Sequence, residues 1–308
     1  MRTRLILTLL CVSLLSIGLI QAQTKIPVWP NEIPNRINSD EQELAENNDI
    51  LWISKIQTPE IEIYLPTRRN VTGVGVMIMP GGGYAGLAYD WEGTDMAKWF
   101  NTLGITAFVL KYRVPLSKSV ENKEWVPLQD AQRAIRIIRS KAAEFRIDPH
   151  KIGIMGFSAG GHLASTLGTH YDQNIPFMND EIDKVSARPD FEILMYPVIS
   201  MKPDITHGGS RDNLIGKNPS QELVNTFSNE LHVNAETPPT FLLHATDDGA
   251  VKVENSLVFY QALKDNNVPV EMHIFPSGGH GFAFGLGNPS LEQWLSLLEQ
   301  WIKQLWEK

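Results

Sequence analysis

KIGIMGFSAGGH, residues 151–162, is the stretch that decides the fold. It opens with an apolar run at 152–155, which predicts a buried strand, and apolar residues at helical spacing follow it. Between the two, residues 156–160 form a G-x-S-x-G pattern with Ser158 at its centre. In such a pattern the serine lies on a sharp strand-to-helix turn, and the glycines let neighbouring backbone pass close by. We therefore predict that Ser158 is a nucleophile presented at the end of a strand.

Strand and helix patterns alternate on both sides of this stretch. Apolar runs predict further strands at 74–79, 105–110, 191–196, 241–245 and 270–275. Amphipathic periodicity predicts helices at 92–103, 127–145, 253–266 and 291–306. This alternation is typical of an α/β protein with a mostly parallel central sheet and helices on both faces. Functional loops are then expected at the carboxyl ends of the strands.

The part of the chain before residue 74 has weaker patterns. Residues 24–50 are polar and irregular, and we expect them to wrap the domain surface. Residues 50–55 and 61–65 read as strands, the second with strict alternation, and we predict that they pair antiparallel at an edge of the sheet.

The N-terminus resembles a secretory signal peptide at residues 1–22. Arg2 and Arg4 precede an apolar run at 5–20, and Ala22 offers the small residue that cleavage requires. The run is shorter than the about 20 residues of a membrane span. We expect a secreted or periplasmic protein with no membrane association after cleavage, in which residues 23–308 form a single catalytic domain.

Cys11 raises the alternative of a lipoprotein. It lies inside the apolar run with no small residues before it, so lipidation is the less expected outcome. Cleavage after the run also removes the chain's only cysteine. The mature chain is therefore expected to use neither disulfides nor thiol chemistry.

The charge of the chain argues against polyanionic partners. Its formal net charge is −8, and its longest basic cluster is Arg68-Arg69. Nucleic acids and anionic membrane surfaces are poor partners for such a protein, and none is expected.

A serine nucleophile needs a base, and the base needs an acid that orients it. With a G-x-S-x-G turn the order along the chain is serine, acid, histidine. Asp247 and Asp248 follow the strand at 241–245, and His280, between glycines, follows the strand at 270–275. Adjacent aspartates must point in different directions, so only one can serve; we prefer Asp248, with Asp247 as the alternative. Activity should fall on acidification as His280 becomes protonated.

A glycine run supplies the second requirement of this chemistry, donors for the oxygen that becomes negative. PGGGY at 80–84 follows a predicted central strand. The backbone N–H groups of Gly82 and Gly83, with that of Ala159 after the serine, are the candidate oxyanion hole. A tight structural turn is the alternative, and a phosphate cradle is discounted because no G-K-[ST] follows. No cofactor is required, and His170, Asp172 and His207 show no metal-ligand spacing, so no metal is predicted.

Other polar and aromatic residues are candidates for roles in or near the site. Tyr84, Trp91 and Trp125 lie in or near loops and could stack on sugar rings, although packing is at least as expected for each. His162 and His244 are expected to pack, and Asp130 and Arg133, one helical turn apart, to form a structural ion pair.

Four segments together resemble one family. They are PGGGY at 80–84, PLQDAQRAIRIIRSKAAEFRIDPHKIGIMGFSAGGHLAS at 127–165, PPTFLLHATDD at 238–248 and SGGHGF at 277–282. The chain resembles the α/β-hydrolase esterases secreted by bacteria that degrade plant polysaccharide, of the acetylxylan-esterase-like or feruloyl-esterase-like kind. The resemblance covers most of the mature chain.

This resemblance implies Ser158 as nucleophile, His280 as base and Asp248 as its partner. One position departs from the lipase-type HGGG pattern, since Pro80 replaces the histidine. The departure weakens an assignment to the hormone-sensitive lipases and leaves the glycine donors in place.

We therefore predict a serine esterase that removes acetyl groups from xylan-type polysaccharide or its oligosaccharides. Its partner would be an acylated carbohydrate or a small ester. The alternatives are a general short-chain carboxylesterase or a feruloyl esterase. A peptidase is less expected, because the large propeller domain that usually accompanies this site has no room before residue 60. A catalytically silent sugar-binding protein is the alternative from another class.

Overall fold

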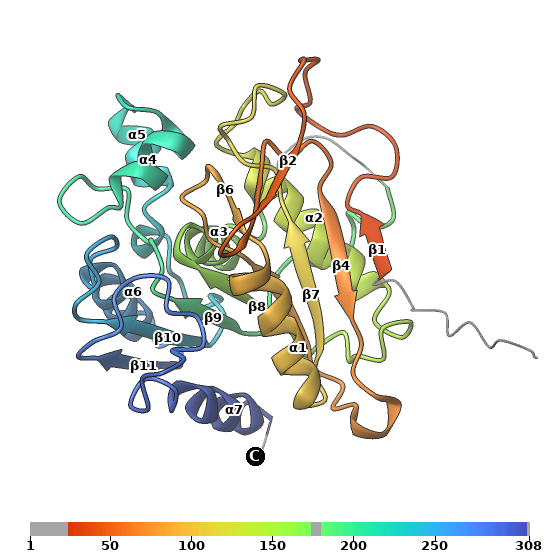
Figure 1. Ribbon diagram of the computed structural model, residues 1–308, viewed down its shortest axis with the longest axis vertical. Helices are drawn as coiled ribbons and strands as arrows, with labels where there is room; N and C mark the ends of the chain where they lie inside the picture. The colour runs from red at the N-terminus through yellow and green to blue at the C-terminus, as the bar shows by residue number, and fades with distance from the viewer. Residues whose placement is uncertain (1–23, 174–179, 307–308) are drawn as a thin grey trace, which may run out of the picture.

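The computed structural model describes residues 24–173 and 180–306 (Figure 1). The predicted signal peptide, residues 1–22, lies outside the described residues. An eight-stranded sheet with the strand order β1-β4-β7-β5-β8-β9-β10-β11 forms the centre of the molecule. The strands are β1 (Thr24–Pro27), β4 (Glu60–Tyr64), β5 (Gly75–Met79), β7 (Thr106–Lys111), β8 (Ile152–Phe157), β9 (Glu192–Met195), β10 (Thr240–Ala245) and β11 (Val270–Phe275). The six strands from β7 to β11 are parallel, and β4 and β1 continue the sheet antiparallel.

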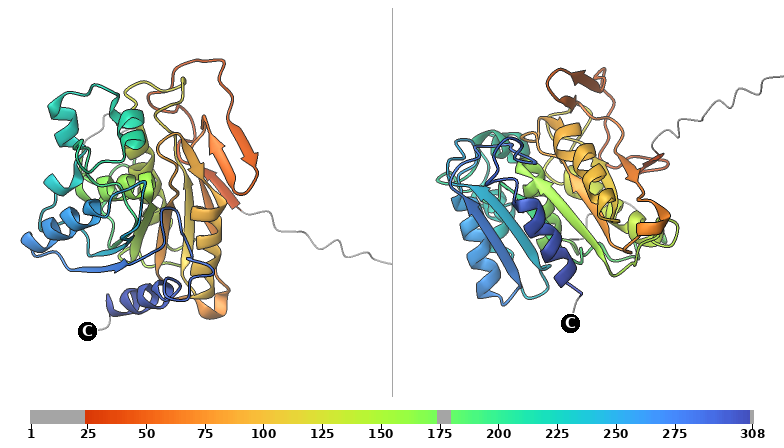
Figure 2. Two further views of the ribbon diagram at one scale, coloured as in Figure 1. Left: turned by 60° about the vertical axis from the view of Figure 1, so that its left-hand side comes forward. Right: turned by 60° about the horizontal axis from the view of Figure 1, so that its bottom comes forward.

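Helices cover both faces of this sheet (Figure 2). The longer ones are α1 (Asp95–Thr102), α2 (Val126–Ser140), α3 (Ser158–Thr169), α6 (Glu254–Asp265) and α7 (Trp294–Gln304). On one face α2 packs against α3, and on the other α1 meets α7 through the rings of Trp99 and Trp294. The predicted α/β class, with a mostly parallel sheet, is confirmed.

The apolar runs became central strands because both of their faces are covered. Every residue of β5, β7 and β8 is buried, as expected of strands between two helix layers. Met79 at the end of β5 lies opposite Gly156 in β8, so the glycine run at 80–84 leaves the sheet beside the serine turn. From residue 74 onward the predicted strands and helices are confirmed to within a few residues, except that α2 ends at Ser140.

The predicted pairing of the two early strands is wrong. β3 (Leu51–Ser54) does not pair with β4 but with β2 (Leu44–Asn47) and β6 (Gly86–Ala88), in a separate three-stranded sheet. Lys55 adopts a positive φ of 53°, which turns the chain away after β3. β4 instead lies between β1 and β7, where its last four residues, 61–64, are all buried.

The polar segment at 24–50 is also more regular than predicted. It contributes β1 to the large sheet and β2 to the small one. Strand pairing uses backbone hydrogen bonds, so a polar strand at a sheet edge carries little signal in its side chains. Two short helices between β9 and β10, α4 (Gly208–Ile215) and α5 (Gln221–Thr226), were likewise not predicted.

The predicted ion pair between Asp130 and Arg133 is wrong as well. Asp130 is fully buried and binds the guanidinium of Arg113, whereas Arg133 binds Asp180 and Asp183. A carboxylate in the interior needs a buried cation with several donors, and Arg113 supplies its backbone N–H as well as its side chain. Within residues 24–173 and 180–306, no helix combines the length and the apolar character needed to cross a bilayer.

Candidate active site

Ser158 lies on a strained turn at the end of the central strand β8. Its φ is +51°, in the left-handed region, and its side chain is 6% exposed. The turn is tight enough to require glycine on both sides. A Cβ at Gly156 would come within 2.2 Å of the Gly160 carbonyl oxygen, and one at Gly160 within 2.1 Å of the Met79 oxygen. This is the geometry that the G-x-S-x-G pattern predicts.

His280 lies between Ser158 and Asp248. Its Nε2 is 2.9 Å from Ser158 Oγ, and its Nδ1 is 2.7 Å from Asp248 Oδ2. The carboxylate requires a donor at Nδ1, which leaves Nε2 to accept the serine proton. The loops after β10 and β11 deliver the two residues to the edge at which β8 ends. The structure thus brings together three residues that are far apart in the sequence.

Asp248 is held as a carboxylate by several donors. Its Oδ1 accepts hydrogen bonds from the N–H groups of Ala250 and Val251, at 2.9 and 2.8 Å. Burial favours the neutral acid, but hydrogen bonds from His244, His280 and the Val251 N–H outweigh it, so the pKa of Asp248 lies below its ordinary value. The residue is therefore ionised throughout the neutral range.

His244 contributes more than the packing role predicted for it. Its ring is fully buried, and its Nε2 lies 3.0 Å from the Val251 carbonyl oxygen and 3.2 Å from Asp248 Oδ2. Its Nδ1 faces the hydroxyl of Ser256 at 2.8 Å. Nothing in the strand pattern around His244 signals this contact, because the ring reaches Asp248 only when the following loop folds back.

Asp247 binds the backbone of the loop that carries His280, not the imidazole. Its Oδ1 accepts hydrogen bonds from the N–H groups of Gly278 and Gly279, at 2.9 and 2.8 Å. The two adjacent aspartates thus face different partners: Asp248 contacts the imidazole, and Asp247 braces the loop that carries it.

The glycine run lies directly against the serine. A Cβ at Gly81 would come within 3.0 Å of Ser158 Cβ. Gly82 and Gly83 have φ values of +139° and +61°, and their N–H groups donate to no described residue. Ala159 lies in the first turn of α3, where an N–H has no intrahelical acceptor. All three predicted N–H donors therefore remain available to a substrate oxygen.

The predicted sugar-stacking role of Tyr84 is wrong. Its side chain is 1% exposed, and its hydroxyl hydrogen-bonds His162 Nδ1 at 2.7 Å. His162 packs as predicted, with its Nε2 donating to the Phe227 carbonyl oxygen, and burial lowers its pKa to about 4. A positive φ of 60° at Tyr84 turns the ring inward from the loop, which a sequence pattern does not reveal.

The two tryptophans lie in different surroundings. Trp91 is half-buried, and its indole N–H donates to the Gly281 carbonyl oxygen at 2.8 Å, next to His280. Trp125 packs against Phe227, with ring centroids 4.9 Å apart. Among the described residues, no group of three or more His, Cys, Asp or Glu side chains could hold a metal ion.

Glu92 and Tyr196 are two further residues near the site that sequence reasoning missed. Both are buried, and the Tyr196 hydroxyl donates to Glu92 Oε1 at 2.8 Å. An acidic residue at the start of an amphipathic helix is ordinarily a favourable helix-end charge. Nothing in the sequence therefore marked Glu92 as buried beneath the site.

Comparison with known proteins gives a family match and close relatives. A family model described as BD-FAE matches residues 61–263. The chain is 35% identical over 246 residues to an acetylxylan esterase of Xylanibacter ruminicola, covering 79% of this chain and 47% of the relative. It is 40% identical over 206 residues to endo-1,4-beta-xylanase B of Butyrivibrio fibrisolvens, covering 67% and 32%. The chain thus spans about half and about a third of the length of these two relatives.

A solved structure with a similar sequence matches over nearly the full length of both chains. It is an acetyl ester-xyloside bifunctional hydrolase from Caldicellulosiruptor lactoaceticus, 38% identical, with a TM-score of 0.79. The match covers 94% of this chain and 98% of the other.

Proposed function

Since the chain belongs to the BD-FAE family and is an acetylxylan-esterase-like carboxylic ester hydrolase of the α/β-hydrolase fold, we propose that Ser158, His280 and Asp248 form its catalytic triad. The observation that carries the proposal is the continuous hydrogen-bonded chain from Ser158 Oγ through the imidazole to Asp248. Its natural substrates are proposed to be acetylated xylan or acetylated xylan oligosaccharides.

The first half of the reaction forms an acyl-enzyme. His280 Nε2 takes the proton from Ser158 Oγ as the oxygen attacks the ester carbonyl carbon. The carbonyl oxygen becomes negative and accepts hydrogen bonds from the N–H groups of Gly82, Gly83 and Ala159. Each such donor is typically worth about 10² to 10³ in rate. Asp248 stabilises the imidazolium until the sugar hydroxyl leaves with the proton from Nε2.

The second half releases acetate. Water replaces the departed alcohol, His280 removes its proton, and the resulting oxygen nucleophile attacks the acyl carbon. A second tetrahedral intermediate, held by the same N–H groups, collapses and returns the proton to Ser158. Both halves use the same base, and the second consumes one water molecule.

The names of the relatives support the choice of substrate. An acetylxylan esterase, a xylanase and an acetyl ester-xyloside hydrolase all act on xylan-related material according to those names. Acetate release from acetylated xylan by the wild type and by Ser158→Ala tests the proposal. We expect the variant to lose at least about 10³-fold in kcat. Equal rates would remove Ser158 as the nucleophile.

Relative rates on acetyl, butyryl and feruloyl esters of one sugar test the acyl group. We expect the acetyl ester to have the highest kcat/KM. A preference for the feruloyl ester would assign the site to feruloyl esterase activity instead.

Export is a further part of the proposed role, since polymeric xylan lies outside the cell that digests it. The basic and apolar pattern of residues 1–22 supports it. N-terminal sequencing of the protein recovered from an expressing bacterium tests the proposal. A mature chain that begins near residue 23 is expected, and an intact Met1 would contradict it.

A further inference from the structure

Glu92 is a buried carboxyl group that the proposed mechanism does not use. Its side chain is 4% exposed, and it lies in the π-helical turn Asp90–Thr94 that precedes α1. Its Oε2 accepts a hydrogen bond from the Gly81 N–H at 2.8 Å, and its Oε1 accepts one from the Tyr196 hydroxyl at 2.8 Å. The residue therefore bridges two loops at the edge where the strands end.

The first of these contacts fixes the peptide unit at the start of the glycine run. The Pro80–Gly81 peptide has its N–H bound by Glu92 and its carbonyl oxygen bound by the hydroxyl of Tyr112, at 2.7 Å. Tyr112 is fully buried, so its hydrogen bond to this peptide lies in the protein interior. The peptide is thus held from both ends, and its orientation sets the direction in which the next two N–H groups leave.

Gly81 also lies against Ser158, so its position bears on the reaction. A Cβ at Gly81 would come within 2.5 Å of Glu92 Oε2, 2.8 Å of the Phe157 carbonyl oxygen and 3.0 Å of Ser158 Cβ. The Glu92 side chain and Ser158 therefore both lie directly against Gly81, which leaves no space for a side chain at that position. A small displacement of Glu92 would move the donors relative to the serine.

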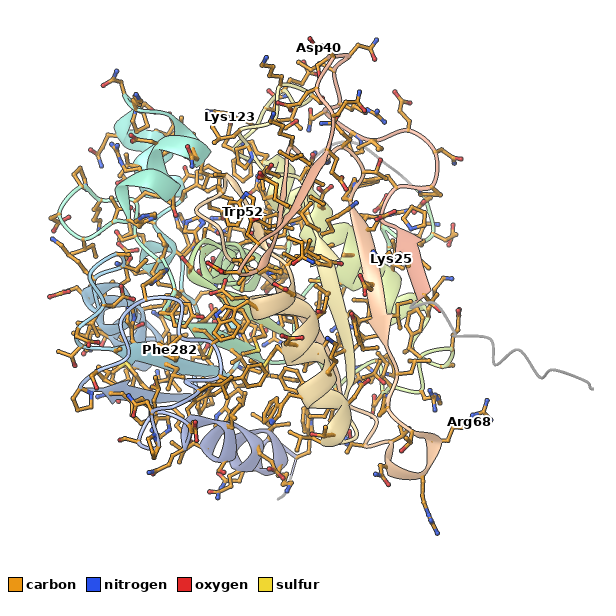
Figure 3. All side chains as sticks on the ribbon, in the orientation of Figure 1. Lys25, Asp40, Trp52, Arg68, Lys123 and Phe282 are labelled. Carbon is orange, nitrogen blue, oxygen red and sulfur yellow. The ribbon has the colours of Figure 1, made fainter. Side chains whose placement is uncertain are left out.

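The second contact leads to the loop that carries His280. Tyr196, at a strained φ of +36°, donates its hydroxyl to Glu92 and accepts the N–H of Ala283 at 3.1 Å. Its ring meets that of His280 edge-on, with centroids 5.0 Å apart. It also packs on Phe282, labelled in Figure 3, at 4.7 Å. One hydroxyl thus joins the carboxylate to the histidine loop.

We propose that Glu92 is a positioning residue, which holds the oxyanion-hole loop against Ser158 and, through Tyr196, holds the loop that carries His280. The inference rests on the proposed function, because it concerns the same site. Glu92 touches no substrate atom in this role. Its effect is to keep two sets of catalytic groups in one geometry, which the transition state requires and substrate binding does not.

The test compares two substitutions of different chemistry. Glu92→Leu fills the space without an acceptor, so the Gly81 N–H and the Tyr196 hydroxyl both lose their partner. Glu92→Gln can still accept from Gly81 with its oxygen and donate to Tyr196 with its amide nitrogen. We expect Glu92→Leu to lose about 10²-fold in kcat on 4-nitrophenyl acetate, the loss typical of one oxyanion donor. KM should change by less than about threefold, and Glu92→Gln should retain kcat within about tenfold.

A trifluoromethyl ketone separates positioning from general loss of stability. It adds to the serine oxygen and forms a tetrahedral oxyanion, so its affinity reports the oxyanion hole directly. Its inhibition constant should rise for Glu92→Leu in parallel with the loss of kcat/KM. Glu192→Gln is the matched control for Glu92→Gln, because it makes the same carboxyl-to-amide change at a buried glutamate that binds Thr240 of β10. It should leave kcat and the inhibition constant unchanged.

These outcomes decide the proposal. A folded Glu92→Leu variant with wild-type kcat and wild-type ketone affinity would overturn it, as would equal losses in Glu92→Leu and Glu92→Gln. If Glu92→Leu does not fold, Tyr196→Phe decides instead: it should lower kcat about tenfold at an unchanged KM, and a wild-type kcat would overturn the proposal. Ser158→Ala keeps the two proposals distinct. An active Ser158→Ala enzyme removes the proposed function, whereas an inactive one beside a fully active Glu92→Leu removes this inference alone.

Discussion

The hydrogen bonds of Asp248 predict how its replacement by asparagine changes the activity. In Asp248→Asn the oxygen can stay with the Ala250 and Val251 N–H groups, which turns the amide nitrogen toward His280 Nδ1. The imidazole must then carry its proton on Nε2, where it cannot accept one from the serine. We expect kcat on 4-nitrophenyl acetate to fall by about 10⁴-fold.

Asp247→Asn is the matched control for that substitution. Its amide oxygen can still accept from Gly278 and Gly279, so kcat should stay within about tenfold of the wild type. A greater loss in Asp247→Asn than in Asp248→Asn would show that the orienting acid has been misassigned.

Single residues were predictable where chemistry restricts their neighbours. Ser158 and His280 follow from glycine spacing and chain order, because a strained turn and a free loop each need particular residues around them. Glu92 and His244 did not follow, since each acquires its contacts only when loops from other parts of the sheet close over it. A buried carboxylate and an exposed helix-end carboxylate look the same in a sequence.

The turn that carries Ser158 brings helix α3 and strand β5 into close contact. Gly160, in the first turn of α3, lies so close to β5 that a Cβ would be 2.1 Å from the Met79 oxygen and 2.5 Å from the Pro80 oxygen. Both neighbours are backbone and cannot rotate away, so Gly160→Ala should force α3 and β5 apart. We expect a loss of about 1–3 kcal/mol in the free energy of unfolding, measured by urea denaturation.

Gly208→Ala is the corresponding control. Gly208 is the first residue of α4, has an ordinary φ, and has no atom within 4 Å of its Cβ position. It should leave the free energy of unfolding within about 1 kcal/mol of the wild type. Equal effects of the two substitutions would contradict the close approach of α3 to β5.

Strand β9 carries a glutamate that links stability to pH. Glu192 is fully buried, its Oε1 accepts from the Thr240 hydroxyl at 2.8 Å, and its Oε2 has no hydrogen-bond partner among the described residues. Burial raises the pKa of Glu192 from 4.5 to about 8. Below pH 4.5 the group is protonated whether the chain is folded or not. As the pH rises to 8, only the unfolded chain releases the proton, so the folded state loses stability.

Glu192→Gln removes that titration. Its melting temperature should exceed that of the wild type by a margin that grows between pH 5 and pH 8 and is constant above pH 8, as measured by scanning calorimetry. Glu222→Gln, at an exposed position in α5, should follow the wild type at every pH. A margin independent of pH would contradict burial of a neutral Glu192.

Elements were predictable where their own residues determine them. The covered strands β5, β7 and β8 carry continuous apolar runs, and α2 and α3 carry apolar stripes, so each was found near its observed bounds. The partner of β3 was not predictable, because pairing depends on the turn at Lys55 and on where β6 lies after the glycine run. A strand at a polar edge pairs through its backbone, so its side chains do not indicate which strand it pairs with.

At the scale of the whole molecule, a buried ion pair between the loop after β7 and helix α2 holds the N-terminal segment, residues 24–50, in place. Asp130 binds Arg113 and also accepts from the Trp29 indole N–H at 2.7 Å, while Arg113 donates to the Pro34 carbonyl oxygen. Asp130→Ala leaves a buried guanidinium without its counter-charge. We expect a loss of about 3–5 kcal/mol in the free energy of unfolding at pH 7, and faster proteolysis within residues 24–50.

An exposed ion pair provides the control for this loss of stability. Glu299→Gln removes the partner of Lys303 on the surface of α7 and should change the free energy of unfolding by less than about 1 kcal/mol. If Asp130→Ala unfolds at nearly the same urea concentration as Glu299→Gln, Asp130 does not anchor the N-terminal segment.

The α/β class of the whole molecule followed from the sequence because alternating periods of strand and helix admit few arrangements. How residues 24–50 attach did not follow, since contacts such as those of Trp29 and Pro34 reach residues about 80 to 100 positions away. Local patterns report which segments are covered, not which distant side chain covers them.

The π-helical turn Asp90–Thr94 limits how this enzyme can be redesigned. Consecutive residues there face separate tasks, since Trp91 reaches the carbonyl of Gly281 while Glu92 reaches the amide of Gly81. Deleting a single position would rotate one side of the turn against the other around the helix axis and detach both contacts. Libraries built for altered acyl preference therefore have to keep the number of residues between the glycine run and α1.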